Sequence, residues 1–290
     1  MTGPVTTGLA LALPRAGALT DAVMAPPTDV VPAEALADLR AQVAGDLAAV
    51  VEAMAEGERL RFDAFRFVLA RRHPELAGGD GGPFVPSPAR CRRAVGLSAV
   101  ARCLRGRSPT PASAVAEVLA AGVEDAADVG DPAGRPPWWA AWYGGLPAGG
   151  RAMVEAEAVT WATQLWTALE WERLAQATVG GDDWWDCPRT RRLTLRGQAD
   201  VRVRPGGRPV LLVVGGGVPP PDWRGSLGFP ALVAALAGRE RSVPARVVGL
   251  WPASGQVRIL PVDSGVLTDT AAAVVDAVAV WVRRRGRPSR

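Results

Sequence analysis

Hydrophobic positions follow a helical period through the first part of the chain. Leu36, Leu39, Val43 and Leu47 recur at spacings of three and four with charged residues between them, which predicts a helix from residue 33 to about 54. Similar spacing, with Ser87-Pro88 as a helix start, predicts further helices over residues 62–72, 88–105 and 111–123.

The pattern changes to a period of two after residue 190. Leu193 and Leu195 alternate with polar neighbours, and Ala199, Val201 and Val203 continue the alternation, which is typical of half-buried strands. The apolar run 210–214 indicates a strand buried on both faces. Further elements are expected as a long helix at 150–178, a helix at 226–237, a hairpin of strands at 245–251 and 256–262, and a final helix at 268–284.

These patterns divide the chain into five segments. Residues 1–31 lack any period and are expected to form a disordered tail. An all-helical region follows over 32–124. The acidic, Gly- and Pro-rich stretch 125–137 is interpreted as a linker, 138–285 as a domain of mixed strands and helices, and 286–290 as a basic tail.

Arginine supplies every basic side chain except one histidine. The chain has 33 residues of the lysine-plus-arginine class and contains no lysine, so no chemistry that needs a lysine amine runs on it alone. The net charge of +4 permits a nucleic-acid partner without demanding one. The single histidine, His73, and the lack of a G-x-S-x-G motif argue against acyl transfer by a Ser-His-Asp triad.

Cysteines and apolar runs bear on the compartment. Cys91, Cys103 and Cys187 are far apart and form no CxxC, so they are interpreted as free thiols rather than zinc or iron–sulfur ligands. No unbroken apolar run reaches the roughly 18 residues that span a bilayer, and no basic residue precedes the apolar start of the chain. The sequence therefore predicts a cytoplasmic protein without a membrane partner.

Aromatic residues concentrate in one region. Eight of the 11 tryptophans lie between Trp138 and Trp185. Indoles beside arginines can stack nucleic-acid bases. Because Trp161 and its neighbours follow the helical period, a role in filling the core is favoured.

The order helix, three strands, helix, strand, strand, helix resembles the PD-(D/E)XK nuclease superfamily, in particular its RecB-type branch. The likeness rests on Glu157-Ala158-Val159-Thr160-Trp161 in the first helix, the G-x-x-D run Gly197-Gln198-Ala199-Asp200, and the strand at 210–214. It implies an αβββαβ core with a mixed central sheet flanked by helices. It covers residues from about 152 to 282.

The resemblance also implies a metal site. Phosphodiester cleavage in such a site uses Mg²⁺ held by carboxylates, which activates water and stabilises the leaving oxygen. Carried onto this chain, Glu157 (or Glu155) matches the helix acid and Asp200 matches the G-x-x-D acid. These two residues are the candidate catalytic and metal-binding side chains.

The third motif of the family is absent. Where the RecB-type branch has acid-x-lysine, this chain has Val213 and Gly215, so both the second acid and the lysine are missing. An isolated Asp200 flanked by Arg196 and Arg202 is otherwise an ordinary solvated strand residue. The sequence therefore predicts a degenerate nuclease-like protein, a pseudoenzyme that needs no cofactor and acts as a nucleic-acid-binding or accessory subunit in DNA processing.

Two alternatives stay open. A divergent Mg²⁺-dependent DNA nuclease would recruit Glu155, Glu157, Asp182 or Asp183 with Asp200, and Arg202 in place of the lysine. A structural module would bind a protein partner, such as a helicase or nuclease subunit, without nucleic acid. The candidate nucleic-acid-binding residues are all arginines: Arg90, Arg92, Arg93, Arg102, Arg105, Arg196 and Arg202.

Overall fold

The computed structural model describes residues 16–26, 30–78, 87–127, 137–174, 177–238 and 243–285. The α-helices are α1 (Ala16–Met24), α2 (Ala33–Val51), α3 (Ala64–Arg72), α4 (Pro88–Leu104), α5 (Pro111–Ala127), α6 (Trp138–Gly144), α7 (Ala148–Thr167), α8 (Trp223–Ala237) and α9 (Ser264–Arg285). The strands are β1 (Leu60–Asp63), β2 (Thr178–Val179), β3 (Asp182–Asp186), β4 (Leu193–Gln198), β5 (Val201–Val203), β6 (Val210–Val214), β7 (Arg246–Trp251) and β8 (Gln256–Pro261).

The described strands form two mixed sheets, which confirms a mixed α/β protein. A three-stranded sheet has the order β1-β4-β3, with β1 parallel to β4 and β3 antiparallel to it. A five-stranded sheet has the order β2-β5-β6-β7-β8, in which only β6 and β7 are parallel. Helix α8 makes the crossover between β6 and β7, as a parallel pair requires.

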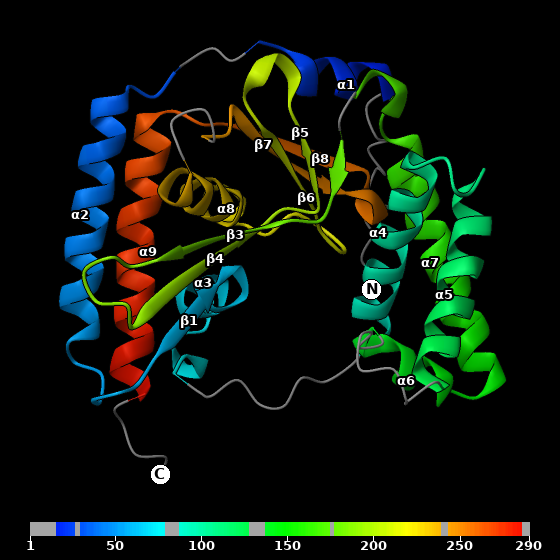
Figure 1. Ribbon diagram of the computed structural model, residues 1–290, viewed down its shortest axis with the longest axis horizontal. Helices are drawn as coiled ribbons and strands as arrows, with labels where there is room; N and C mark the ends of the chain where they lie inside the picture. The colour runs from blue at the N-terminus through cyan, green and yellow to red at the C-terminus, as the bar shows by residue number, and fades with distance from the viewer. Residues whose placement is uncertain are drawn as a thin grey trace, which may run out of the picture.

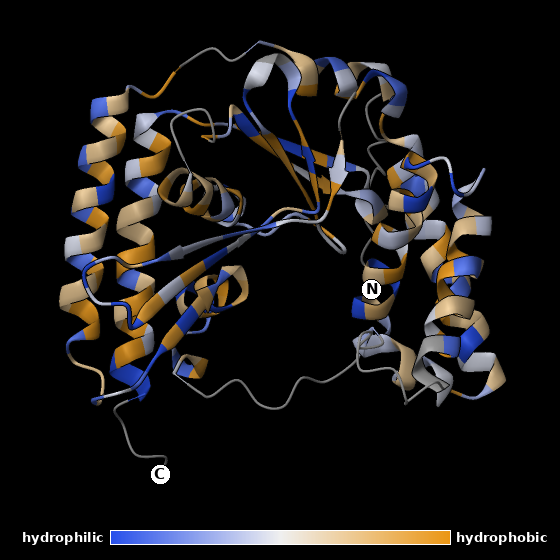
Figure 2. Cartoon of the chain, in the orientation of Figure 1, coloured by the Kyte–Doolittle hydropathy of each residue, from blue (hydrophilic) through white to orange (hydrophobic). Residues whose placement is uncertain are grey.

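The five-stranded sheet separates two hydrophobic cores (Figure 1). Along β6, Leu211 faces the core built with α2, α3, α8 and α9, while Leu212 and Val214 face the core built with α4, α5, α6 and α7. Successive strand side chains point to opposite faces, so a continuous apolar strand serves both cores. Figure 2 shows hydrophobic residues along both α2 and α9, which lie side by side.

Helix α1 corrects the expectation of a disordered tail over residues 1–31. Its Leu19 and Val23 are buried in the core of α4 to α7. Arg246 of β7 donates hydrogen bonds to the backbone oxygens of Ala22, Ala25 and Pro26, so a cation satisfies the carbonyls at the end of this helix. Residues 1–15 lie outside the described chain.

Strand β1 corrects two further expectations, a helix from residue 62 and an all-helical region over 32–124. Leu60 and Phe62 are buried while Arg61 is exposed, and the strand pairs with β4 some 130 residues away. The helix begins only at Ala64, where the Asp63 carboxylate accepts from the Arg66 N–H as an N-cap. A four-residue alternation is too short to distinguish from a helix by period alone.

Helix α7 is shorter than predicted. It ends at Thr167 instead of continuing to residue 178, and the strands β2 and β3 follow. Strand β3, with the sequence DDWWD, was not predicted, because its two tryptophans are adjacent and the strand has no alternation of apolar and polar residues. The helices predicted at 33–54, 88–105, 111–123, 226–237 and 268–284, and the antiparallel hairpin of β7 and β8, are confirmed within a few residues.

The proposed division of the chain is only partly covered. Most of the linker 125–137 and all of the tail 286–290 lie outside the described residues. Within the described residues, α4 and α5 of the segment 32–124 pack directly on α7 of the segment 138–285. Helix α9 is the one described helix whose length and composition would suit a membrane span, and its buried residues pack on α2 and α8, as in the core helices of many proteins.

Candidate functional site

Asp200 lies where the chain passes from one sheet to the other. Strand β4 belongs to the three-stranded sheet and β5 to the five-stranded sheet, and only Ala199 and Asp200 separate them. The Asp200 carboxylate accepts a 2.6 Å hydrogen bond from the Val214 N–H through Oδ2. The Asp200 backbone N–H also donates to the Leu212 carbonyl oxygen at 2.8 Å, so both the backbone and the side chain of Asp200 bond to β6.

Arg93 of α4 binds the same carboxylate. Its Nη2 donates to Asp200 Oδ1, and its Nε donates to the Val214 carbonyl oxygen at 3.2 Å. Only 2 % of the Asp200 side chain is exposed, against 36 % of Arg93. One guanidinium thus bridges a carboxylate and a backbone carbonyl at the end of β6.

Burial raises the pKa of the Asp200 carboxyl above its usual range, because the charged form is removed from water. The Arg93 charge and the Val214 N–H act in the opposite direction and favour the ionised form. The expectation that Asp200 is a solvated strand residue is therefore wrong.

Glu157 of α7 is also bound by an arginine. Arg92 Nη1 lies 3.2 Å from Glu157 Oε2, and the two side chains are 30 % and 39 % exposed. Arg92 and Arg93 are neighbours on α4, so one helix supplies a cation to each of the two candidate catalytic acids. Helix α4 reaches Glu157 because it packs on α7.

This arrangement does not fit a divalent cation shared by Asp200 and Glu157. Mg²⁺ prefers carboxylate and carbonyl oxygens as ligands. Those at Asp200 and Val214 already accept hydrogen bonds from Arg93, and Glu157 pairs with Arg92. The described residues contain no group of three or more His, Cys, Asp or Glu side chains positioned to hold a metal.

Trp251 excludes a side chain at the position matched to the lysine. A Cβ added to Gly215 would lie 2.2 Å from Trp251 Nε1 and 2.5 Å from its Cδ1. Atoms do not approach so closely, and Trp251 is itself only 4 % exposed. Glycine at 215 therefore lets the indole pack over the end of β6.

Most of the candidate nucleic-acid-binding arginines bind carboxylates. Besides Arg92 and Arg93, Arg102 bonds to Glu117, Arg196 to Asp182 and Arg202 to Asp183. Arg90 has interactions of its own, and Arg105 is exposed at the C-terminal end of α4. The structure brings Arg92 and Arg93 together with the two candidate acids, and places Arg196 and Arg202 on β4 and β5.

Trp184 was singled out in the sequence only as one of a group. It is 44 % exposed on β3, and the guanidinium carbons of Arg61 and Arg196 lie 5.0 Å and 5.1 Å from its ring centroid. The tryptophans Trp139, Trp161, Trp171 and Trp185 are buried, as expected of core residues. Cys91, Cys103 and Cys187 are free and buried, and burial raises the pKa of the Cys91 thiol to about 11.

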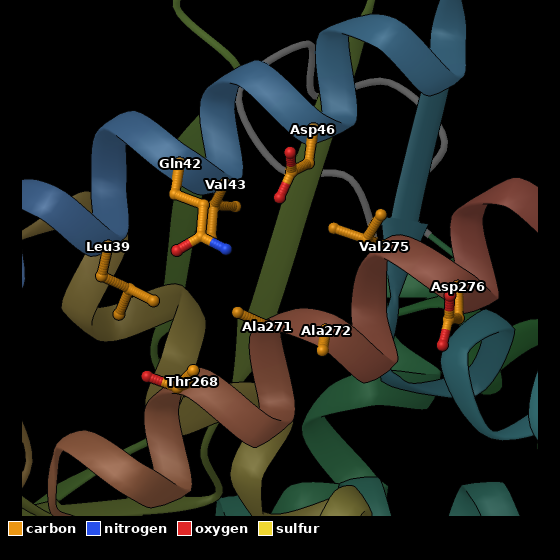
Figure 3. A pocket seen from close by; sticks show the side chains of 9 residues that line it. All are labelled: Leu39, Gln42, Val43, Asp46, Thr268, Ala271, Ala272, Val275 and Asp276. Atoms are coloured by element: carbon orange, nitrogen blue, oxygen red, sulfur yellow. The ribbon is translucent and has the colours of Figure 1, made fainter.

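The described surface also has hollows away from these residues. A pocket of about 210 Å³ lies between α2 and α9, where Gln42 and Asp46 extend from α2 over the small side chains of Ala271 and Ala272 (Figure 3). None of the candidate site residues lines it. A second pocket, of about 430 Å³, lies between α1 and strand β8.

Comparison with known proteins gives no identification: no family model, no curated protein and no solved structure matches this chain.

The pairing of Arg93 with Asp200 could not be found in the sequence. The two residues are 107 positions apart, and the apolar spacing of α4 indicates only which side of the helix is buried. The one signal was the position of Arg93 beside the buried residues of α4, which places a cation close to the core.

Proposed function

We propose that this chain is a catalytically inactive, nuclease-like protein that acts as an accessory subunit in DNA processing. One observation carries the proposal: the Arg93 guanidinium binds the Asp200 carboxylate and the Val214 carbonyl, the oxygens that a cation would otherwise use. A tethered arginine in this place stabilises the junction of the sheets and does not supply a base or a reactive water.

The arrangement of elements supports the nuclease-like part of the proposal. Helix α7, strands β3 to β6, helix α8 and strand β7 follow the order αβββαβ of the RecB-type resemblance when β4 and β5, which lie in different sheets, are counted as one strand and the two-residue β2 is left aside. Strands β3, β4 with β5, and β6 are successive antiparallel neighbours, and β6 and β7 are parallel around α8. The exclusion of a side chain at Gly215 supports the inactive part.

Binding to DNA is expected to contribute less to the accessory role than binding to a protein partner. Five of the seven candidate arginines pair with carboxylates, which reduces the charge that they offer to phosphates. We therefore expect weak DNA binding that falls steeply with salt, and a larger contribution from a protein partner.

Activity with metal ions tests the proposal directly. Purified protein is incubated with single-stranded and duplex DNA and with Mg²⁺ or Mn²⁺, and products are followed over long times. The expected result is no cleavage by the wild-type protein. The control is Asp269→Ala, at an exposed aspartate of α9. Cleavage that Asp200→Ala abolishes while circular dichroism shows the variant still folded, and that Asp269→Ala leaves intact, would overturn the inactive assignment in favour of a divergent nuclease.

A mobility-shift series over salt concentration tests the contact with DNA. Wild-type protein is compared with Arg105→Gln, which removes an exposed cation, and with Arg102→Gln, which removes a paired one. A weak, salt-sensitive shift that Arg105→Gln reduces more than Arg102→Gln supports the contact. The lack of any shift at low ionic strength would remove DNA from the proposal and leave a module that binds protein alone.

A further inference from the structure

Strand β8 forms one edge of the five-stranded sheet. It pairs with β7 on one side, and no described strand pairs with the other. An unpaired edge presents backbone N–H and C=O groups on which another chain can add as a strand.

The register identifies which residues face outward. The Val262 N–H donates to the Ala245 carbonyl of the neighbouring strand, so residue 262 directs its backbone toward β7. Because the direction alternates in an antiparallel ladder, Val257 and Ile259 direct their N–H and C=O groups to the open side. The bond from Arg258 Nη1 to the Val257 carbonyl oxygen agrees with this assignment.

A pocket of about 430 Å³ runs along this edge. Helix α1 forms one wall with Ala18, Leu19 and Ala22, the strand supplies Val257, Arg258 and Ile259, and Trp223 completes it. The volume lies within the range of about 300–1,000 Å³ that is usual for ligand sites. In Figure 1, α1 lies near β8, which is the edge strand of the five-stranded sheet.

Helix α1 is held firmly enough to serve as a wall. In addition to the bonds from Arg246 to its C-terminal carbonyls, Thr20 Oγ1 accepts from the Glu170 N–H at 2.9 Å. Arg173 pairs with Asp21 at 2.7 Å. The groove between this helix and β8 is therefore fixed by contacts to two other parts of the fold.

The positive charge of Arg258 indicates which chemical group would bind in this pocket. Within the described residues, Arg258 bonds to the Val257 carbonyl and to Gln256 Oε1, neither of which is charged. The walls are otherwise apolar. A guanidinium in such a place suits a carboxylate, because charge-assisted hydrogen bonds are the strong ones.

We propose that β8 and α1 form a binding groove for an extended peptide of a partner protein, which adds to the sheet as a strand, places alternate apolar side chains against Val257 and Ile259, and presents a carboxylate to Arg258. The proposal deepens the accessory role stated above and rests on it. The affinity comes from main-chain bonds to the outward groups, and the selectivity from the apolar wall and the arginine.

Fluorescence anisotropy with a defined peptide tests this groove. The probe is a labelled acetyl-Thr-Val-Thr-Val-Thr-Val-Asp, with two analogues that are N-methylated at one or the other set of alternate residues. Saturable binding is expected for the parent and for one analogue only, since just one set of amides faces β8. Equal binding of all three, or no binding of the parent at millimolar concentrations, would overturn the proposal.

Two substitutions separate main-chain pairing from simple apolar contact. Ile259→Pro removes an outward N–H and leaves the ladder with β7 intact, so we expect about tenfold weaker binding, the equivalent of one lost hydrogen bond. Ile259→Val keeps the N–H and is expected to bind nearly as the wild type. Arg258→Gln is expected to weaken only peptides with a carboxylate; unchanged binding by both Ile259→Pro and Arg258→Gln contradicts the proposal.

Other occupants give distinct results. A dimer in light scattering that Ile259→Pro dissociates would assign the groove to a second copy of the chain. Tighter peptide binding after deletion of residues 1–15 would assign it to the chain's own N-terminal segment. Either result overturns the partner peptide but leaves the cleavage assay unaffected, so failure here is distinguishable from failure of the accessory role.

Discussion

The pairs Arg93–Asp200 and Arg196–Asp182 have the same chemistry but different surroundings. Asp200 is 2 % exposed and also accepts from a backbone N–H, whereas Arg196 and Asp182 are 33 % and 23 % exposed on the three-stranded sheet. An ion pair near water contributes little, because solvent screens it and the free partners are well hydrated. In the Arg93–Asp200 pair the carboxylate is buried while Arg93 is 36 % exposed, so loss of the arginine leaves an uncompensated buried charge. The same two residue types therefore contribute to stability at Arg93–Asp200 and contribute little at Arg196–Asp182.

Removal of each aspartate in turn is expected to have the largest effect. Asp200→Ala leaves the Val214 N–H without its acceptor and Arg93 without its partner, so we expect a loss of about 3–5 kcal/mol in the free energy of unfolding. Asp182→Ala is expected to cost less than about 1 kcal/mol. Denaturant unfolding of both variants measures the difference, and equal losses would show that burial does not distinguish the pairs.

Removal of the arginine tests the charge of Asp200. Arg93→Met leaves a buried carboxylate without its cation, and we expect a loss of about 3 kcal/mol at neutral pH. The pKa of Asp200 is raised by burial and would rise further, so the folded state binds a proton more tightly than the unfolded chain. Its stability therefore increases as the pH falls through the folded pKa, and the deficit of the variant shrinks.

The neighbouring residue supplies the control for that experiment. Arg92→Met breaks a pair whose side chains are 30 % and 39 % exposed, and is expected to change stability by less than about 1 kcal/mol without this pH dependence. An Arg93→Met deficit that stays constant from neutral to acid pH would contradict the assignment of the effect to Asp200.

Packing beside the buried pair is tested by Gly215→Ala. The new Cβ would lie 2.2 Å from Trp251 Nε1, so we expect a loss of about 1–3 kcal/mol as the indole shifts. Gly216→Ala is the matched control, because no atom lies within 4 Å of its added Cβ. Thermal unfolding of the two variants distinguishes them, and similar melting temperatures would mean that the end of β6 has room for a side chain.

The smallest effect is expected at an exposed carboxylate. Hydrogen bonds from Ser108 and then from Arg102 lower the pKa of Glu117. A depressed folded pKa contributes stability above the unfolded pKa, and this contribution is lost as the pH falls through the folded value. Glu117→Gln should therefore flatten the acid side of a plot of melting temperature against pH, and an unchanged slope would count against it.

Much of the fold could be predicted from local pattern. The helices α2, α4, α5, α8 and α9, the strands from Leu193 to Val214 and the hairpin of β7 and β8 all have the apolar period of their element. The misses have a common cause. Strand β1 has only four residues and strand β3 has no alternation, so neither is recognised locally, and both pair with β4, which lies between them. Helix α1 has too few residues for a clear period and is fixed by distant partners.

The residue types that this protein lacks can be read directly from its sequence. The chain has no lysine and one histidine. It has Val213 and Gly215 at the acid and lysine positions of the RecB-type resemblance, so its differences from that motif are visible in the sequence. The surroundings of Asp200, in contrast, depend on the tertiary fold. Burial, a backbone N–H and a guanidinium from a helix 107 residues away set the state of that carboxylate, and these are properties of packing, which no local pattern of residues contains.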